Sequence, residues 1–290
     1  MRNFLISYKW IEAEINRLNP NVDSSKIIRL YLSSIFPRSA IAVNLLYTLG
    51  LIRLCSSREQ SIPVHRNGQG KVYKRGDQRA DETNYHLLMW LENDINEPHV
   101  QNSLAHVRRI HDAVGKSWIM RQEAFLHALA SFTLLVDRFL VHILNLEALE
   151  EQKRAALLHQ FQQVGLHLGI KNIPSTWQEM EAYLESYEQS DNMGYSLEGA
   201  QVAEALINQF VERWFPGFLY QQGRWLVVSL LEQHIVEALR LERPPEIFTQ
   251  SIRFSVKTFI QFKRNFLPDP SKIFSLSEIA QYHKKSKLKI

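Results

Sequence analysis

The sequence predicts an all-α protein that folds as a single multi-helix globular domain. Apolar residues recur three and four positions apart through most of the chain, which is the spacing of one face of a helix. No stretch alternates apolar and polar residues for long enough to indicate a sheet. No linker rich in Pro, Gly or Ser divides the 290 residues, of which 45% are hydrophobic, so one domain over 1–290 with a large core is expected.

The helical pattern occurs in eleven segments along the chain. They are 4–18, 26–34, 39–54, 84–96, 100–114, 122–146, 148–168, 176–189, 197–213, 225–241 and 246–264. Several boundaries carry helix-ending or helix-starting chemistry. Asn19-Pro20-Asn21 ends the first segment, and Ser175 or Thr176, with Glu179 close behind, is suited to cap a helix start.

Two regions lack this pattern. Residues 56–80 include Asn67-Gly68-Gln69-Gly70 and many charges, and we expect a flexible surface loop there. Residues 281–290 form a basic C-terminal tail with four lysines. The alternatives for the tail are a solvated, frayed terminus and a contact with anionic phosphates or lipid head groups.

Composition excludes several classes of function. The formal net charge is only +4, and the basic residues are scattered among acidic ones, so no nucleic-acid partner is expected. The single cysteine, Cys55, rules out an internal disulfide and fits a reducing, cytoplasmic compartment. No secretory signal is visible, and charged residues interrupt the apolar runs before the roughly 18 residues needed to span a bilayer. Glycine-rich phosphate loops, paired-cysteine metal patterns and Gly-x-Ser-x-Gly elbows are absent.

Two histidine-bearing segments draw attention. In the first, Arg108 and Asp112 lie one helical turn apart, with Arg109 and His111 beside them. The second runs from Glu123 to Arg138 and places His127, Ser131 and Arg138 close to one stripe of a helix that is otherwise apolar. We expect these two helices to face one another.

The role of His127 has two interpretations at this point. A buried polar group must find a partner, so His127 either forms a hydrogen bond within the core or binds something. A lone imidazole in an apolar helical pocket is one way in which proteins hold haem iron, and nearby arginines suit haem propionates.

The order of several short motifs resembles the family of MpaB oxygenases and latex clearing protein, which are rubber oxygenases. The resemblance covers about residues 15–265. It rests on five segments, which are Asn19-Pro20 through Asp23, Arg79-Ala80-Asp81-Glu82-Thr83, Arg108-Arg109-Ile110-His111, Gly165 through Pro174 followed by Tyr187-Glu188, and Leu239-Arg240-Leu241-Glu242-Arg243-Pro244-Pro245.

This resemblance implies an oxidoreductase with the helical core of the rubber oxygenases, haem b as cofactor, O2 as oxidant and an apolar, isoprenoid or lipid-like substrate. By position, His127 matches the axial ligand of the haem iron, and His111 is the second candidate. Arg109 and Arg138 are the candidate haem-binding arginines. Arg108 matches the arginine of the family's distal motif. Glu92, sixteen residues earlier, and Asp112 are expected to act with it on bound oxygen.

A second hypothesis is a haem-free helical protein that keeps the scaffold and binds a lipophilic ligand. Both hypotheses allow contact with a membrane surface through the basic tail and the aromatic segment Trp214-Phe215-Pro216-Gly217-Phe218, whose alternative role is to pack in the core. The sequence leaves the oligomeric state open.

Overall fold

The structure, a computed structural model, describes residues 8–118 and 120–280 and shows an all-α globular domain, so the predicted fold class is confirmed. The helices are α2 (Trp10–Ile15), α3 (Ser24–Ile35), α4 (Ala40–Cys55), α5 (Arg58–His65), α6 (Lys71–Lys74), α7 (Gly76–Glu92), α8 (Pro98–Ser117), α9 (Gln122–Arg138), the π-helix η1 (Phe139–Ile143), α10 (Glu151–Leu168), α11 (Trp177–Glu188), α12 (Leu197–Trp214), the 3-10 helix η2 (Gly217–Leu219), α13 (Tyr220–Ser229), α14 (Gln233–Ala238) and α15 (Glu246–Phe266). The described residues form no strand.

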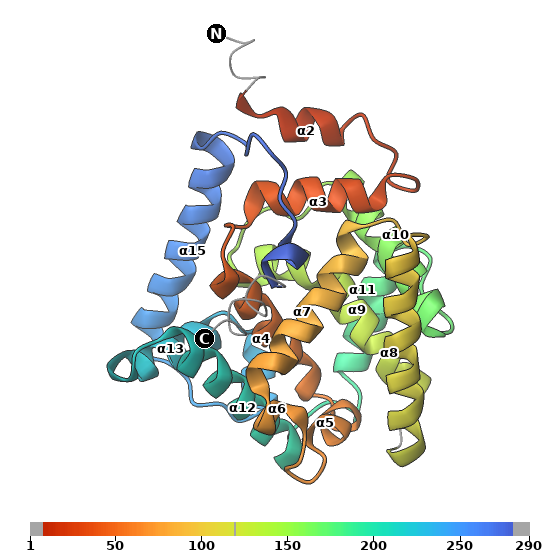
Figure 1. Ribbon diagram of the computed structural model, residues 1–290. Coiled ribbons are helices and arrows are strands. Elements are labelled where there is room, and N and C mark those ends of the chain that lie inside the picture. Colours follow the sequence, from red (N-terminus) through yellow and green to blue (C-terminus); the bar gives the residue numbers. More distant parts are fainter. Residues whose placement is uncertain (1–7, 119, 281–290) are drawn as a thin grey trace, which may run out of the picture.

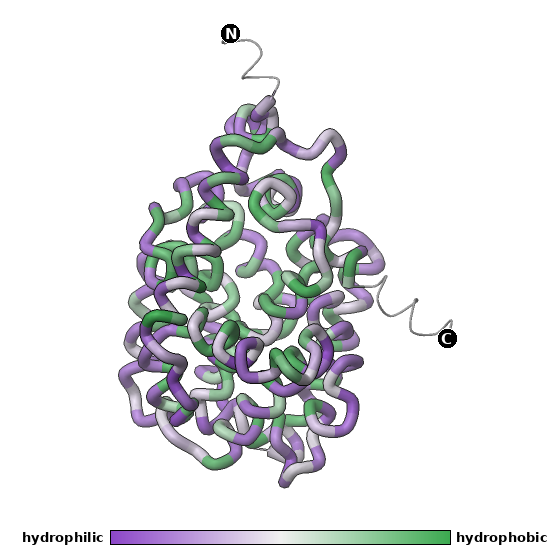
Figure 2. The backbone as a smooth tube through the Cα atoms, turned by 90° about the vertical axis from the view of Figure 1, so that its left-hand side faces the viewer, coloured by the Kyte–Doolittle hydropathy of each residue, from purple (hydrophilic) through white to green (hydrophobic). Residues whose placement is uncertain are grey.

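Helices α4 and α9 lie inside the bundle, and the other helices surround them (Figure 1). Helix α4 packs against α12, α7 and α9, while α10 packs against α3, α8 and α9. Helix α15 runs along the outside, where it contacts α13 and α3. Figure 2 shows hydrophilic and hydrophobic residues interleaved along most of the helical turns, as expected for helices that turn one face to a core.

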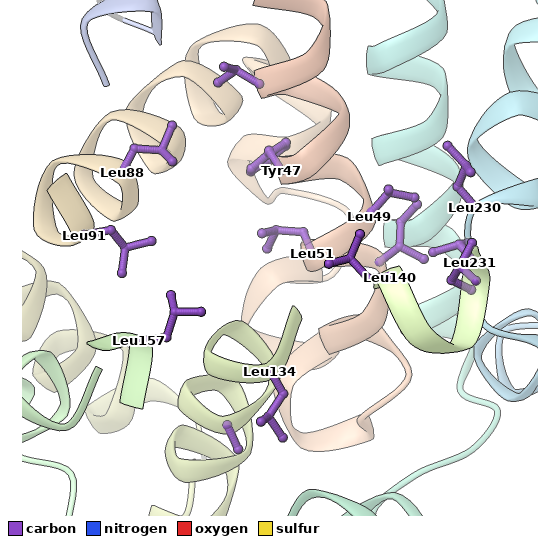
Figure 3. Close-up of a cluster of buried hydrophobic side chains, with 14 of the residues drawn as sticks. Tyr47, Leu49, Leu51, Leu88, Leu91, Leu134, Leu140, Leu157, Leu230 and Leu231 are labelled. Atoms are coloured by element: carbon purple, nitrogen blue, oxygen red, sulfur yellow. The ribbon is translucent and has the colours of Figure 1, made fainter. Parts of the chain in front are cut away.

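The buried core gathers side chains from most helices. Figure 3 shows Leu88 and Leu91 of α7 turned toward the same region as Leu51 of α4 and Leu157 of α10. Gly165 of α10 permits a close approach to α9, because a Cβ at this position would lie 2.7 Å from Leu129 Cδ2. A side chain here would therefore require the ends of the Leu129 and Ile173 side chains to shift.

Helix α9 continues directly into η1, and Gln122–Ile143 together are long and apolar enough to cross a membrane. However, 56% of the most apolar window is buried within the protein, as is usual for a core helix. Packing in the core therefore accounts for the apolar character of this segment.

The sequence-based boundaries agree with the structure at most helices. The capping box before α11 is confirmed, since Thr176 Oγ1 accepts a hydrogen bond from Glu179 N at 3.2 Å and the Glu179 carboxylate accepts one from Thr176 N. The segment 225–241 is two helices rather than one, because the chain breaks its helical course at Leu230-Leu231-Glu232 between α13 and α14. Residues 281–290, the basic tail, lie outside the described residues.

Residues 56–80 differ from the expected flexible loop. They form α5, α6 and the start of α7, and Ser57, Gln60, Ser61 and Val72 are buried. The sequence does not indicate these helices because α5 has no apolar stripe. It buries polar side chains instead, and hydrogen bonds satisfy them. Ser61 Oγ, for example, donates to Arg58 O.

Candidate functional site

The inner face of α9 places His127 at the centre of a small polar group. The His127 side chain has no exposure to solvent. The Gln60 side chain of α5 places Nε2 2.6 Å from His127 Nδ1, and the same Nε2 donates to Ala124 O at 2.9 Å. Tyr187 of α11 stacks on the imidazole ring with centroids 4.2 Å apart. Ser131 Oγ, one helical turn along α9, lies 3.4 Å from His127 Nε2.

These contacts define the protonation state of His127. Burial lowers the pKa of His127 to about 3, and the positive charges of Arg53 and Arg138 act in the same direction, whereas Glu188 opposes them. The imidazole is therefore neutral at physiological pH, the form that binds metal ions. Since Gln60 Nε2 also donates to Ala124 O, its second hydrogen points at Nδ1, and the single ring proton lies on Nε2.

A buried cluster of four charges lies next to this group. Arg53 of α4 donates from Nη1 to Glu232 at 2.6 Å and from Nη2 to Glu188 at 2.5 Å. Arg138, the last residue of α9, donates from Nε to Glu232 and from Nη2 to Glu188, both at 3.1 Å. Two guanidinium groups and two carboxylates therefore neutralise each other in the interior, where an unpaired charge would be costly.

The four charged residues of this cluster come from separate elements. Glu188 ends α11, directly after the Tyr187 that stacks on His127, and Glu232 lies in the turn between α13 and α14. Burial raises the pKa of Glu188, but a hydrogen bond from His234 and the charges of Arg53 and Arg138 outweigh it and bring the value to about 2. Both carboxylates are consequently ionised at neutral pH.

Glu188, Glu232 and His234 each offer a ligand atom within 4.8 Å of the others, a spacing that a metal ion can use. Both carboxylates already bind two guanidinium groups, and the cluster is charge-balanced without an ion. A dication would have to displace these ion pairs, so the arrangement does not favour a metal site here.

An apolar cavity of about 220 Å³ lies between α4, η1, the α13–α14 turn and α15. Its wall includes Leu49, Leu140, Leu230 and Leu231, whose side chains are drawn close together in Figure 3. Arg53 and Glu232 are the only charged side chains in the described wall, and they form its one polar end. His127 is not part of this wall.

The residues expected to act on oxygen occupy two separate places, the exposed side of α8 and the buried end of α7. Arg108 is exposed and donates to His167 O at 3.4 Å, at the end of α10. Asp112 is exposed on α8. Glu92 is buried and accepts hydrogen bonds from Leu276 N at 2.8 Å, from Ser277 N at 3.1 Å and from Ser275 Oγ. Among the described residues, no hydrogen bond or ion pair joins these three to one another or to His127.

The candidate haem-binding residues are also dispersed. Arg109 is exposed, with its Nε donating to Ala105 O, and Arg138 is committed to the buried ion cluster. His111 lies 5.2 Å from the Phe125 ring, and burial lowers its pKa. Helices α8 and α9 meet where His111 lies against Phe125, while each packs more extensively on α10. Of the residues predicted for the site, only His127 and Arg138 lie near this interior group.

Sequence reasoning missed Gln60, Arg53 and Glu232 as members of the site. Gln60 lies in the segment expected to be a loop, and Arg53 follows an apolar run that gives no sign of a partner. Tyr187-Glu188 was identified as a motif but without a role. One feature of the sequence could have indicated these residues. A charged residue within or next to an apolar helix requires a buried partner of opposite charge.

Comparison with protein families assigns residues 62–256 to the catalytic domain described as ER-bound oxygenase mpaB/B'/Rubber oxygenase. The chain belongs to this family. The match includes His127 and the whole ion cluster except Arg53, while Gln60 lies just before its first residue. A search of curated proteins found no match.

Among solved structures, the family member latex clearing protein LCP in the closed state is similar to this chain, with a TM-score of 0.64 and 18% sequence identity. The similarity covers 90% of this chain and 73% of that protein. At this identity the comparison establishes the shared helical fold. The resemblance drawn from the motifs is thereby confirmed at the level of family and fold.

Proposed function

We propose that this family member is a haem-b-dependent oxygenase that uses O2 to oxidise an apolar, isoprenoid or lipid-like substrate, and that His127 would bind the haem iron. One observation carries the assignment of the ligand. His127 is a wholly buried, neutral imidazole whose Nε2 has only the long 3.4 Å contact with Ser131 of its own helix. Family membership supports the oxygenase class.

The fit of His127 to an iron ligand requires one rearrangement. Binding through Nε2 needs the ring proton on Nδ1, whereas Gln60 Nε2 now donates to Nδ1. Rotation of the Gln60 amide by half a turn would bring Oε1 to Nδ1 to accept that proton, and the hydrogen bond from Gln60 to Ala124 O would be lost. A ligand histidine is usually held in this way by an acceptor on its second nitrogen, so Gln60 is the residue that would orient His127.

Haem b supplies the redox chemistry with O2, and the protein contributes binding, orientation and exclusion of water. In this chain, burial and the nearby Arg53 and Arg138 keep His127 unprotonated, and Tyr187 fixes the plane of its ring. The ion cluster leaves Arg53 and Arg138 without a free charge for propionates. Arg108, Glu92 and Asp112 form no hydrogen bond or ion pair with His127 among the described residues, so no role in the reaction is assigned to them.

A haem titration tests the proposal. Purified protein is mixed with increasing haem, and the absorption spectrum is recorded. We expect a Soret band that saturates at one haem per chain, because a neutral buried imidazole binds iron strongly. A spectrum identical to that of free haem throughout the titration would overturn the proposal. In that case the apolar cavity would favour the second candidate, a haem-free protein that binds a lipophilic ligand.

We further propose that the protein touches membrane surfaces through an apolar face on α15. Ile247, Phe254, Phe262 and Phe266 lie exposed along one side of this helix, and no residue of α15 is fully buried. The cations Lys257 and Arg253 donate to backbone carbonyls, of Asn145 and Ser229, so no acidic partner cancels their charge there. Because these two cations bond toward the rest of the protein, the proposal rests on the exposed apolar face itself, which suits insertion into a lipid surface.

The aromatic segment at 214–218 contributes less to this surface than the sequence indicated. Trp214 Nε1 donates to Asn44 Oδ1 at 2.7 Å, and Phe215 packs against Phe210. Only Phe218 extends outward, with 81% of its surface exposed. Core packing therefore accounts for most of this segment.

Flotation with vesicles of phosphatidylserine and phosphatidylcholine measures the membrane contact. We expect the wild-type chain to float, and the triple variant Phe254→Ser, Phe262→Ser, Phe266→Ser to lose roughly ten-fold or more of its binding, because three apolar anchors are removed. The matched control Gln250→Ser, Gln261→Ser changes exposed polar residues of the same helix and is expected to float like the wild type. Equal flotation of the two variants would contradict the assignment of this face.

A further inference from the structure

The apolar cavity beside Arg53 has the composition of a binding site for a small, mostly hydrocarbon molecule. Carbon side chains from several parts of the chain form its wall, including Leu46 of α4, Leu140 of η1, Leu231 of the α13–α14 turn and Ile260 of α15. Such a site gains affinity from the apolar surface that it removes from water. If these apolar walls alone determined the ligand, it would be a pure hydrocarbon without a polar group.

The polar end adds one specific feature. Arg53 uses Nη1 and Nη2 for Glu232 and Glu188, but its Nε is buried and has no hydrogen-bond partner. The residue is 6% exposed, so water at the protein surface does not serve this donor. A buried donor without an acceptor is unfavourable, and a ligand oxygen that accepts from it removes this cost.

The charge balance of the cluster determines which oxygen fits. Arg53 and Arg138 are matched by Glu188 and Glu232, so the polar end carries no net charge. A carboxylate entering the cavity would bring an unpaired negative charge next to two others, which is costly in an apolar interior. A carbonyl oxygen accepts a hydrogen bond without adding charge.

We propose that this cavity binds an apolar molecule with one neutral carbonyl oxygen, a ketone, aldehyde or ester, which accepts the hydrogen bond from Arg53 Nε. The molecule's chain lies among the leucines, and Val256, Phe259 and Ile260 of α15 form the outer wall. Phe259 is 45% exposed while it also lines the cavity, so it marks the side from which a ligand enters.

This site is separate from the proposed haem ligand, and its occupation does not rest on haem. Leu135 of the cavity wall follows His127 by eight residues on α9, which corresponds to about 12 Å along the helix axis. The ion cluster contributes Arg53 and Glu232 to the wall, while its Glu188 adjoins the Tyr187 that stacks on His127. A test on haem-free protein therefore distinguishes failure of this proposal from failure of the oxygenase proposal.

The test compares three probes of the same chain length, methyl pentyl ketone, heptane and heptanoate, with haem-free full-length protein. Isothermal titration calorimetry gives the dissociation constants, and thermal unfolding at equal ligand concentration gives an independent ranking. We expect the ketone to bind roughly three- to ten-fold more tightly than heptane, the effect of one additional hydrogen bond. Heptanoate is expected to bind more weakly than heptane.

Two variants locate the binding. Ala42→Phe fills the cavity from α4 and is expected to abolish binding of the ketone, whereas Ala105→Phe, on the exposed surface of α8, is expected to leave it unchanged. Equal affinities for ketone and heptane would overturn the role of Arg53 Nε. Tighter binding of heptanoate would overturn the neutral ligand class. Undiminished binding in a folded Ala42→Phe variant, or no binding of any probe to the wild type, would overturn the site.

Discussion

Replacement of Arg53 by alanine is expected to lower the free energy of unfolding by about 3–5 kcal/mol, the usual cost of removing one partner from a buried ion pair. Arg53 is bound to both Glu188 and Glu232, and all three side chains are less than one-tenth exposed. The substitution leaves two buried carboxylates with Arg138 as their one guanidinium partner. Urea denaturation followed by circular dichroism measures the change.

Two controls separate charge balance from loss of packing. Arg109→Ala removes an exposed arginine from α8 and is expected to change the free energy of unfolding by less than about 0.5 kcal/mol. The double variant Arg53→Met, Glu232→Leu removes one charge of each sign and leaves the Arg138–Glu188 pair. We expect it to be more stable than Arg53→Ala, because apolar replacements of a buried pair are often tolerated. An Arg53→Ala variant as stable as Arg109→Ala would contradict this account of the cluster.

Replacement of His127 by alanine is expected to abolish the Soret band that haem produces on titration of the wild-type protein. The imidazole is the group that we propose as the iron ligand, and within the described interior its neighbours Gln60, Ser131 and Tyr187 offer no second imidazole. Absorption spectra at equal haem and protein concentrations measure the loss. The far-ultraviolet circular dichroism spectrum must remain helical for the comparison to hold.

His111→Ala is the matched control, because it removes the other candidate histidine, which lies against Phe125. We expect its Soret band to match that of the wild type. Loss of the band in His111→Ala with retention in His127→Ala would reassign the ligand to α8. Loss in neither variant would show that haem is held by another group.

The helical fold was predictable because it depends on local periodicity. The expected segments at 39–54, 197–213 and 246–264 agree with α4, α12 and α15 to within about two residues. The segments that failed depend on tertiary contacts. Helix α5 buries Gln60 and Ser61 rather than an apolar stripe, and the break at 230–232 places Glu232 between two arginines. Neither requirement is visible in a local window of sequence.

The site was only partly predictable for a related reason. The polar stripe that α9 contributes to the site was predictable from the sequence, since His127, Ser131 and Arg138 follow helical spacing. The partners of these residues come from α5, α11 and the α13–α14 turn, which lie between 50 and 94 residues away along the chain. Glu92 illustrates the opposite error, because an acidic residue that matched a proposed base is instead fully occupied by backbone amides of residues 276 and 277.

The three hydrogen bonds at Glu92 also set the limits of the smallest fragment of this chain that can be expected to fold. Residues 62–256 match the family, but Glu92 within them is satisfied only by Ser275, Leu276 and Ser277 beyond them. The same excision would remove Arg53 from Glu188 and Glu232, and Gln60 from His127. A protein trimmed to the matching region would therefore leave the buried Glu92 without these donors, and Glu188 and Glu232 with Arg138 as their one guanidinium partner. Expression plasmids for this family member should extend on both sides of the recognised domain.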